Sequence, residues 1–282
     1  MFEKVLFATD FSEYARKTLE CIGEIPGMKE IILLHVVDAT HYSKMGWTHT
    51  RYVEDAKIRL EEQKEHLKGL GLEVKTIVEV ITEGDIPHTI LDMADKEKVS
   101  LIVIGAKGKS IISELLLGGV SLNVLRLAKT HVLLMRYRLA DSLEGEKLEK
   151  FCNRIFSRAL CATDFSRHSI DTLSFIKGLG IKDIVLIHVV TKGDTQEEID
   201  INIQETRKKL NDIKQKMSKF NIKDHVRVGN PAEEIISVAE EEDVSLIVMN
   251  ARGEGWFKEL LFGSTIYDVV KNAKRPILVV NR

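Results

Sequence analysis

Two glycine-rich segments in the first half of the chain have the residue types and spacing of an anion-binding site. Gly105 to Gly108 reads GAKG and follows an apolar run, and Gly118 to Ser121 reads GGVS and opens a helical pattern nine residues later. Glycine permits positive φ and close backbone approach, so N–H groups can surround an anion. A helix N-terminus adds partial positive charge. With the hydroxyl of Ser121 as a further donor, these segments predict a phosphate site.

Two more groups are expected beside this phosphate site. Asp10 ends the first apolar run of the chain, and Val36 lies near the end of the second. In an open α/β sheet, ligands bind at the carboxyl ends of the strands. Asp10 can accept hydrogen bonds from ribose hydroxyls there, and backbone groups near Val36 can contact an adenine edge. The combination predicts a nucleotide site.

The elements that must position these residues occur twice. FEKVLFATDFS at 2–12 returns as FSRALCATDFS at 156–166, and VSLIVIGAKG at 99–108 returns as VSLIVMNARG at 244–253. The offsets of 154 and 145 residues correspond to a whole domain rather than to a solenoid repeat. We therefore expect two related domains at 1–138 and 154–282, joined by a charged, partly helical linker at 139–153.

Each half alternates short apolar runs with helical patterns, which predicts parallel strands with helical crossovers. The first half has predicted strands at Lys4–Ala8, Glu30–Val37, Glu73–Val80, Leu101–Ile104 and His131–Met135. The second half has them at Ala159–Ala162, Asp183–Val190, Lys223–Val228, Leu246–Met249 and Pro276–Val280. The first helix of each half is expected at Glu13–Ile22 and Arg167–Gly178, and Asp85 and Asn230 are expected N-caps. The fold class is α/β, with two tandem doubly wound five-stranded parallel-sheet domains.

The Gly-x2-Gly-x9-Gly spacing, together with ATDFS and LLHVVD, resembles the universal stress protein family over essentially the whole chain, as two tandem copies. The resemblance implies an adenine nucleotide alpha-hydrolase-like domain with strand order 3-2-1-4-5. It implies an adenine-nucleotide-binding regulatory or stress-response module, with ATP or AMP as ligand and with or without Mg²⁺. It also implies pairing of domains through their last strands, which two fused copies can achieve within one chain.

The resemblance also implies the residues of each site. In the first half these are Ala8, Asp10, Val36, Ile104, Gly105, Gly108, Gly118, Gly119, Val120 and Ser121. In the second half they are Ala162, Asp164, Val189, Met249, Asn250, Gly253, Gly263, Ser264, Thr265 and Ile266.

Three positions depart from the family pattern. Gly119 stands where nucleotide-binding members carry Ser or Thr, Asn250 replaces the first glycine, and Ile266 replaces the hydroxyl of Ser121. Asn tolerates positive φ, so the turn at Asn250 is expected to survive. We expect the first site to grip phosphate more firmly than the second.

Structural roles compete with these functional ones. His35 and His188 end the second strand of both halves, which favours a structural hydrogen bond over catalysis. Asp10 and Asp164 precede helices, so helix capping is an alternative to ribose binding. The glycines can serve tight strand-to-helix packing alone. Three loop cations, Lys107, Lys109 and Arg252, suit either phosphate neutralisation or simple solvent exposure.

Composition excludes several classes. The 282 residues are 44% hydrophobic and 30% charged with a net charge of −2, so neither nucleic acid nor a membrane is an expected partner. Three cysteines without CxxC spacing favour a reducing cytoplasm and no metal site. We expect an unknown protein partner and no catalytic residue. The alternatives are a slow ATPase or nucleotide hydrolase, and a dimerisation scaffold that binds no nucleotide.

The pseudo-twofold repeat and the open sheet edges predict a homodimer. Light scattering coupled to size exclusion should give about twice the 31.9 kDa mass of one chain. A strict monomer at micromolar concentration would contradict this expectation.

Overall fold

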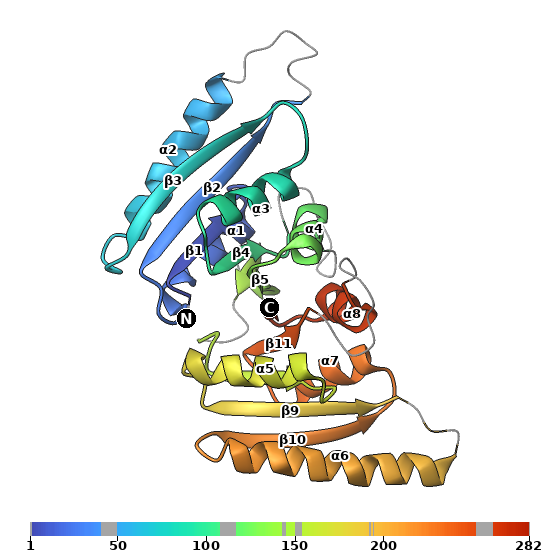
Figure 1. Cartoon of the computed structure of the whole chain (residues 1–282). Coiled ribbons are helices and arrows are strands. Elements are labelled where there is room, and N and C mark those ends of the chain that lie inside the picture. Colours follow the sequence, from blue (N-terminus) through green and yellow to red (C-terminus); the bar gives the residue numbers. More distant parts are fainter. Residues whose placement is uncertain are drawn as a thin grey trace. The chain divides into compact units, whose positions relative to one another are not determined.

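The computed structural model describes residues 2–40, 50–107, 117–142, 145–149, 154–191, 193, 195–251 and 262–281. For residues 138–149 it describes the backbone only. The chain divides into two compact units, Met1–Glu149 and Lys150–Arg282 (Figure 1). Both units have the same architecture, and each is described by itself.

The first unit has a five-stranded parallel sheet in the order β3-β2-β1-β4-β5. Its strands are β1 (Lys4–Ala8), β2 (Glu30–Asp38), β3 (Glu73–Ile81), β4 (Leu101–Gly105) and β5 (His131–Met135). Its helices are α1 (Glu13–Leu19), α2 (Thr50–His66), α3 (Ile86–Lys96) and α4 (Gly119–Leu127).

The second unit repeats this order as β10-β9-β8-β11-β12. Its strands are β8 (Arg158–Ala162), β9 (Asp183–Val190), β10 (Asn221–Val228), β11 (Leu246–Asn250) and β12 (Ile277–Val280). Its helices are α5 (Arg167–Ile176), α6 (Gln196–Lys216), α7 (Pro231–Glu241) and α8 (Ser264–Asn272). The predicted strand order 3-2-1-4-5 is therefore confirmed.

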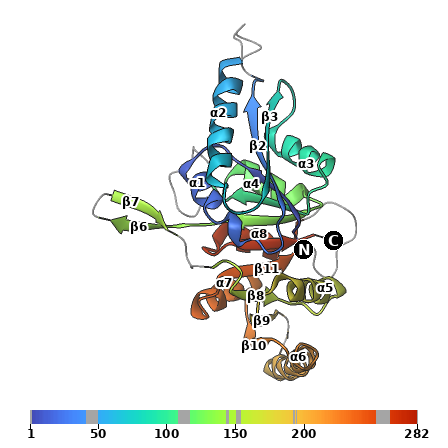
Figure 2. The ribbon, with the colours of Figure 1, turned by 90° about the vertical axis from the view of Figure 1, so that its left-hand side faces the viewer.

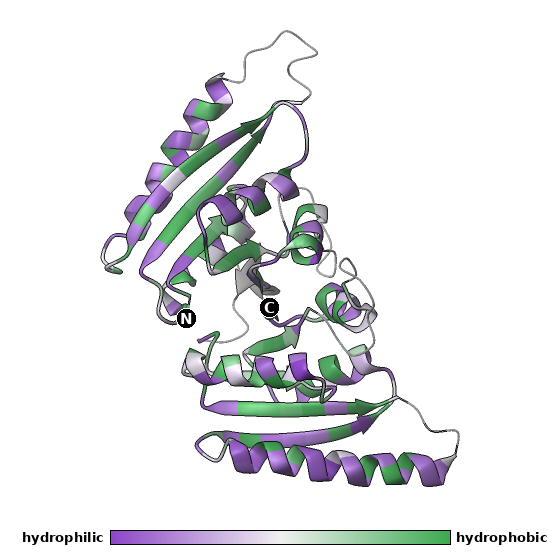
Figure 3. Cartoon of the chain, viewed as in Figure 1, coloured by the Kyte–Doolittle hydropathy of each residue, from purple (hydrophilic) through white to green (hydrophobic). Residues whose placement is uncertain are grey.

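The topology decides which helices share a face of each sheet. The first three strands of a unit run toward one sheet edge, and the chain then returns across the middle to the other edge. Because parallel crossovers are right-handed, α5 and α6 cover one face of the second sheet, and α7 and α8 cover the other. The central strands are buried on both sides, and Figure 3 shows them as hydrophobic while α2 and α6 carry a broad hydrophilic outer face. In the described part of the chain, no helix is long and apolar enough to cross a membrane.

Local signals placed most element boundaries correctly. The Asp85 carboxylate accepts from the backbone N–H of His88, and the Asn230 side chain accepts from the N–H of Ala232, so both predicted caps are confirmed. The first helix of each unit is shorter than predicted. It ends in a 3₁₀ turn, at Ile22–Glu24 in the first unit and at Lys177–Leu179 in the second.

The expectation of helix in the linker is wrong. Arg138–Ser142 (β6) and Gly145–Glu149 (β7) form an antiparallel two-stranded ribbon, which Figure 2 shows apart from the large sheets. A mixture of charged and apolar residues suits a strand as well as a helix when the segment is this short. The boundary between the compact units, after Glu149, falls inside the predicted linker. The exact domain limits stay a prediction.

A buried carboxylate ties the far end of α7 to the sheet. The Glu242 carboxylate is only 8% exposed and lies 2.6 Å from Lys223 Nζ, 2.9 Å from His225 Nε2 and 2.5 Å from Arg158. Hydrogen bonding from Lys223, and then from His225, lowers the pKa of Glu242. Glu97 holds the equivalent place in the first unit, where Lys4 and Lys75 contact it.

We expect Glu242→Gln to destabilise the second unit by about 1–2 kcal/mol at pH 7, the low end for hydrogen bonds to charge because the partners are partly exposed. A lowered pKa stabilises the fold above the unfolded value of 4.5 and stops doing so as pH falls through the folded value. The difference between wild type and variant, measured by urea unfolding, should therefore shrink below that pH.

The control is Glu240→Gln on the same helix, whose exposed pair with Lys274 should contribute less than about 0.5 kcal/mol. Equal effects of the two substitutions, or a Glu242 effect that does not change with pH, would contradict the prediction.

Candidate functional site

A four-residue turn after the first strand is repeated atom for atom in both units. In the first unit Thr9 Oγ1 accepts from Phe11 N at 3.1 Å, and Asp10 Oδ1 accepts from Ser12 N at 2.9 Å. In the second unit the equivalent bonds are 3.1 and 3.0 Å long. They hold Phe11 and Phe165 at φ of 60° and 61°, a left-handed conformation that is rare for a bulky residue.

This turn settles the competing interpretation of the aspartates. The helix N-caps are Ser12 and Ser166, whose hydroxyls accept from the N–H of Ala15 and Ser169. Asp10 therefore does not cap α1 directly, and helix capping as its sole role is wrong. Its carboxylate, like that of Asp164, lies at the carboxyl end of the first strand, where the ribose was expected.

The same turn opens a gap in the sheet. Pairing of β8 with β9 ends at Ala162 and Ile187, and the last bond runs from Thr163 N to the Ile187 carbonyl. Backbone groups two residues apart on a strand face the same neighbour. The N–H and C=O of Val189 therefore face the space beyond the end of β8. Val36 has the equivalent place in the first unit, because Thr9 N donates to the Leu34 carbonyl.

The helices that follow the glycine segments begin without side-chain caps. Five helices have a Ser, Asp, Thr or Asn as N-cap, and its side chain accepts a backbone N–H; these are residues 12, 85, 166, 195 and 230. By contrast, the N-caps of α4 and α8 are Gly118 and Gly263, and neither makes a side-chain cap bond. The N–H groups of their first turns are thus left for another acceptor.

Positive φ does not explain the described residues of the glycine segments. Gly118 and Gly263 have φ of −65° and −60°, and neither Gly105 nor Asn250 has positive φ. Gly105 is constrained by space instead, because a Cβ there would lie 3.3 Å from the Lys107 carbonyl oxygen.

Ser121 has a different partner from the one expected. Its hydroxyl is buried and donates to the Gly105 carbonyl at 2.7 Å, so its only hydrogen ties α4 to β4 rather than facing a phosphate. In the second unit Ile266 is buried at the same place. Asn250, which replaces Gly105, instead ties β11 to α5 by donating to the His168 carbonyl at 3.3 Å and to Thr172 Oγ1 at 3.1 Å.

The histidines confirm their structural interpretation. His35 Nδ1 lies 2.7 Å from the Thr9 carbonyl and His188 Nδ1 lies 2.8 Å from the Thr163 carbonyl. Each ring packs on the phenylalanine of the preceding turn, with centroids 4.3 Å apart in the first unit and 4.6 Å in the second. Burial lowers the pKa of His188, opposed by the Thr163 carbonyl and the Asp164 charge.

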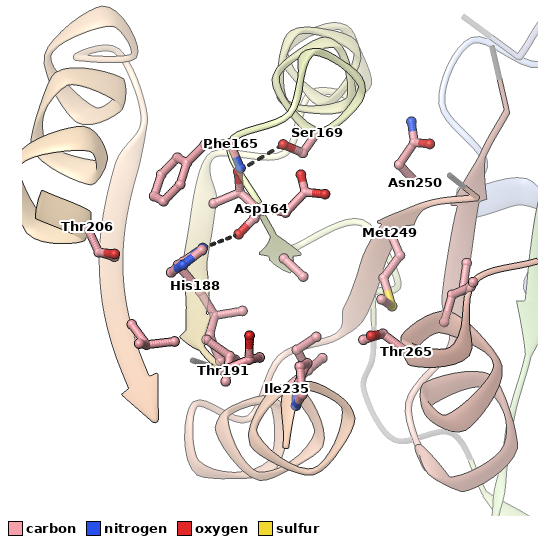
Figure 4. Close-up of a pocket in the computed structure, with 18 of the residues that line it drawn as sticks. Asp164, Phe165, Ser169, His188, Thr191, Thr206, Ile235, Met249, Asn250 and Thr265 are labelled. Carbon is pink, nitrogen blue, oxygen red and sulfur yellow. Dashed lines mark hydrogen bonds between the residues drawn. The ribbon is translucent and has the colours of Figure 1, made fainter. Parts of the chain in front are cut away.

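These features converge on a pocket of about 600 Å³ in the second unit (Figure 4). Its lining includes every described residue predicted for the second site: Ala162, Asp164, Val189, Met249, Asn250, Gly263, Ser264, Thr265 and Ile266. In Figure 4, Met249 and Thr265 lie on one side and Ile235 lies on α7 opposite α5. The predicted residues of β8, β9, β11 and α8 are thus brought together.

The corresponding residues of the first unit lie at the same strand ends. Ala8 pairs with Ile104 across β1 and β4. Gly118 opens α4, while Gly119, exposed, and Val120, half-buried, form its first turn. Lys107 is buried, with its ammonium 5.4 Å from the centroid of the Tyr14 ring, so it is not an exposed loop charge.

Several predictions fall outside the described residues. They concern Gly108 and Gly253 of the two glycine segments and the cations Lys109 and Arg252.

Sequence reasoning missed Phe165, Ile235, Thr206 and Lys209 of the pocket lining. The repeat of ATDFS in both halves was a signal for the phenylalanine. The α6 residues gave no such signal, because in a charged helix the sequence does not distinguish a polar residue that lines a pocket from one that is exposed to solvent.

Comparison with known proteins agrees with this geometry. The family model described as "Universal stress protein family" matches residues 1–136 and 156–281. Universal stress protein MJ0577 of Methanocaldococcus jannaschii is 31% identical over 48% of this chain and 96% of its own length. Universal stress protein Slr1230 of Synechocystis is 24% identical over 98% of this chain and 88% of its own. A crystal structure of a universal stress protein from Archaeoglobus fulgidus superposes with a TM-score of 0.74 at 25% identity, covering 100% of this chain and 99% of that one. The chain, with its two copies of one domain, belongs to the universal stress protein family.

Proposed function

We propose that the second unit binds an adenine nucleotide, and that the chain acts as a regulatory or stress-response module through that binding. One observation carries the proposal: all described residues predicted for this site line a single pocket. Its volume of about 600 Å³ lies within the usual range for small-molecule sites.

The first turn of α8 fits the phosphate end. It has no side-chain cap and its residues line the pocket, so its backbone N–H groups and the positive end of the helix dipole are available there together. Ser264 and Thr265 add two hydroxyls to the lining. A helix N-terminus alone does not make a ligand site. Here it lies in the lining of a cavity, in which the rest of the ligand fits.

Other residues of the same lining fit the base and the sugar. Val189, Ile235 and Met249 provide apolar contact for a ring, and the backbone of Val189 beyond the end of β8 provides a donor and an acceptor for its edge. Asp164, at the end of β8 in the same lining, suits ribose hydroxyls. Each of these contacts serves binding, and none requires a covalent bond to be formed or broken. Nucleotide binding without catalysis therefore accounts for the arrangement.

The structure favours the opposite ranking of the two sites from the one expected from sequence. The Ser121 hydroxyl already donates to the Gly105 carbonyl, so Ile266 does not remove a hydrogen that is free for phosphate. The second unit has Ser264 and Thr265 where the first has Gly119 and Val120. We therefore propose the second unit as the stronger phosphate site. The choice between ATP and AMP, a role for Mg²⁺, cytoplasmic location, homodimerisation and the hydrolase alternative remain predictions.

Asp164→Asn should weaken binding of AMP to the full chain about tenfold or more, because a hydrogen bond to a charged acceptor contributes about 1.5–3 kcal/mol. Asparagine keeps the oxygen that accepts from Ser166, so the turn should remain. Titration calorimetry with AMP, and then ATP, measures affinity and stoichiometry.

The matched control is Asp10→Asn, which makes the same change in the same turn of the first unit. It should leave the tighter binding event intact. Loss of that event with Asp10→Asn rather than Asp164→Asn would place the stronger site in the first unit. Absence of binding at millimolar AMP and ATP would leave the scaffold alternative.

Ser121→Ala should destabilise the first unit by about 1–2 kcal/mol, because the buried Gly105 carbonyl loses its donor. Nucleotide affinity should be unchanged. Urea unfolding and calorimetry separate the two readouts, and Ser174→Ala, which removes an exposed hydroxyl, should cost less than about 0.5 kcal/mol. A loss of affinity without a loss of stability would restore Ser121 as a phosphate ligand.

A further inference from the structure

The pocket of the second unit continues around the end of β9 to the other face of the sheet. Side chains alternate along a strand, so Ile187 and Val189 face α7 while His188 and Val190 face α6. The lining includes residues of both sets. We call the part on the second face the α6-side compartment, formed by Phe165, His188 and Thr206 with Glu205 and Lys209 at its rim.

His188 presents a defined hydrogen-bond acceptor to this compartment. The Thr163 carbonyl can only accept, so Nδ1 carries the ring hydrogen in the 2.8 Å contact between them. In the neutral ring, Nε2 then has a lone pair. Burial lowers the pKa of His188 and keeps the ring neutral at pH 7. Within the described residues, Nε2 has no hydrogen-bond partner.

Thr206 supplies a hydroxyl in the middle of α6. Its side chain is only 5% exposed, yet among the described residues its hydroxyl has no hydrogen bond. Figure 4 shows Thr206 projecting from α6 toward the side of the pocket where His188 lies. Packing does not account for a hydroxyl here, because the first unit has Ala56 at the equivalent place, four residues before a buried leucine in both helices.

The first unit treats the equivalent space differently. Gln63, on the next turn of α2, donates from Nε2 to Thr9 Oγ1 at 3.4 Å. The second unit has Ile213 at that place, and Thr163 Oγ1 bonds Ser169 Oγ at 3.0 Å instead. In the first unit the side-chain amide of Gln63 thus bonds to the turn after β1. In the second unit the equivalent helix position is Ile213, which has no polar group for the turn after β8.

Charges around the compartment oppose one another. The Lys209 ammonium lies 5.2 Å from the centroid of the Phe165 ring, whose other neighbour is His188. Lys209 acts on His188 as a positive charge and Asp164 as a negative one, and Glu205 adds a second carboxylate at the rim. This balance favours neither a cation nor an anion.

We propose that the α6-side compartment is a separate binding site for an uncharged group that bears a hydroxyl or an amide N–H. Such a group donates to Nε2 of His188 and bonds to the hydroxyl of Thr206. It lies on the opposite sheet face from the proposed phosphate end, and the proposal does not depend on nucleotide binding at α8.

Nitrogen NMR of the full chain with ¹⁵N-labelled histidine tests this site, with acetamide and D-ribose as probes. We expect the Nε2 signal of His188 to shift saturably with at least one probe. The Nε2 signal of His35 is the internal control and should not shift, because its ring has the same Nδ1 bond but the first unit has Ala56 in place of Thr206. Sodium phosphate should not reproduce the shift.

Two variants make the test specific. Thr206→Ala should weaken the probe about fivefold, the equivalent of one neutral hydrogen bond of about 1 kcal/mol. Thr206→Ser, which keeps the hydroxyl, should restore binding. Neither should change the affinity for AMP by more than about twofold if the compartments are separate.

Three results would overturn the proposal. These are no saturable shift with either probe, equal shifts of His35 and His188, or a probe affinity that Thr206→Ala leaves unchanged. A fall in AMP affinity in Thr206→Ala would show instead that the compartment is part of the nucleotide site. If AMP does not bind at all but the probes do, nucleotide binding fails and this proposal stands.

Discussion

Each unit depends on the turn that ends its first strand. Threonine and aspartate side chains accept the next backbone N–H groups, and together they hold a phenylalanine in a left-handed conformation that is unfavourable by about 1–2 kcal/mol for a non-glycine residue. Because the turn leaves the sheet early, the backbone of the neighbouring strand has no strand partner beyond it among the described residues. The same turn directs the aspartate toward that gap and fixes the histidine beneath the phenylalanine. The pocket is thus a consequence of where one strand stops.

The two units solve one packing problem in two ways. The end of the fourth strand must be anchored to a helix, because the loop that follows leaves the sheet there. In the first unit the anchor is a hydroxyl on the helix after the loop, which bonds a glycine carbonyl. In the second unit the anchor is an asparagine on the strand itself, which bonds the helix on the opposite face. The isoleucine that looked like the loss of a phosphate ligand and the asparagine that replaces a glycine are thus parts of one structural exchange.

The sequence was sufficient for the parts of the fold that depend on local physics. Continuous apolar runs predicted the ten strands of the two large sheets, and Asp85 and Asn230 predicted helix starts, because burial on both faces and capping leave clear patterns. The strand-end position of the site followed from topology alone. What failed needed three-dimensional contacts. The partner of Ser121 lies sixteen residues away in the chain, Gly105 proved to be limited by space rather than by φ, and the short linker ribbon has a composition common to helix and strand. Thr206 was invisible because only its burial distinguishes it from its solvated neighbours.

The exchange of anchors also limits how the two halves can change over evolutionary time. Returning Asn250 to glycine would take the amide from the carbonyl of His168 and the hydroxyl of Thr172 while Ile266 still offers nothing to the strand end. Introducing serine at Ile266 first would keep the asparagine bonds and add a second anchor, so only this order keeps the strand end anchored at each step. The order in which the two residues can change is therefore constrained, although the backbone that the repeats share remains the same.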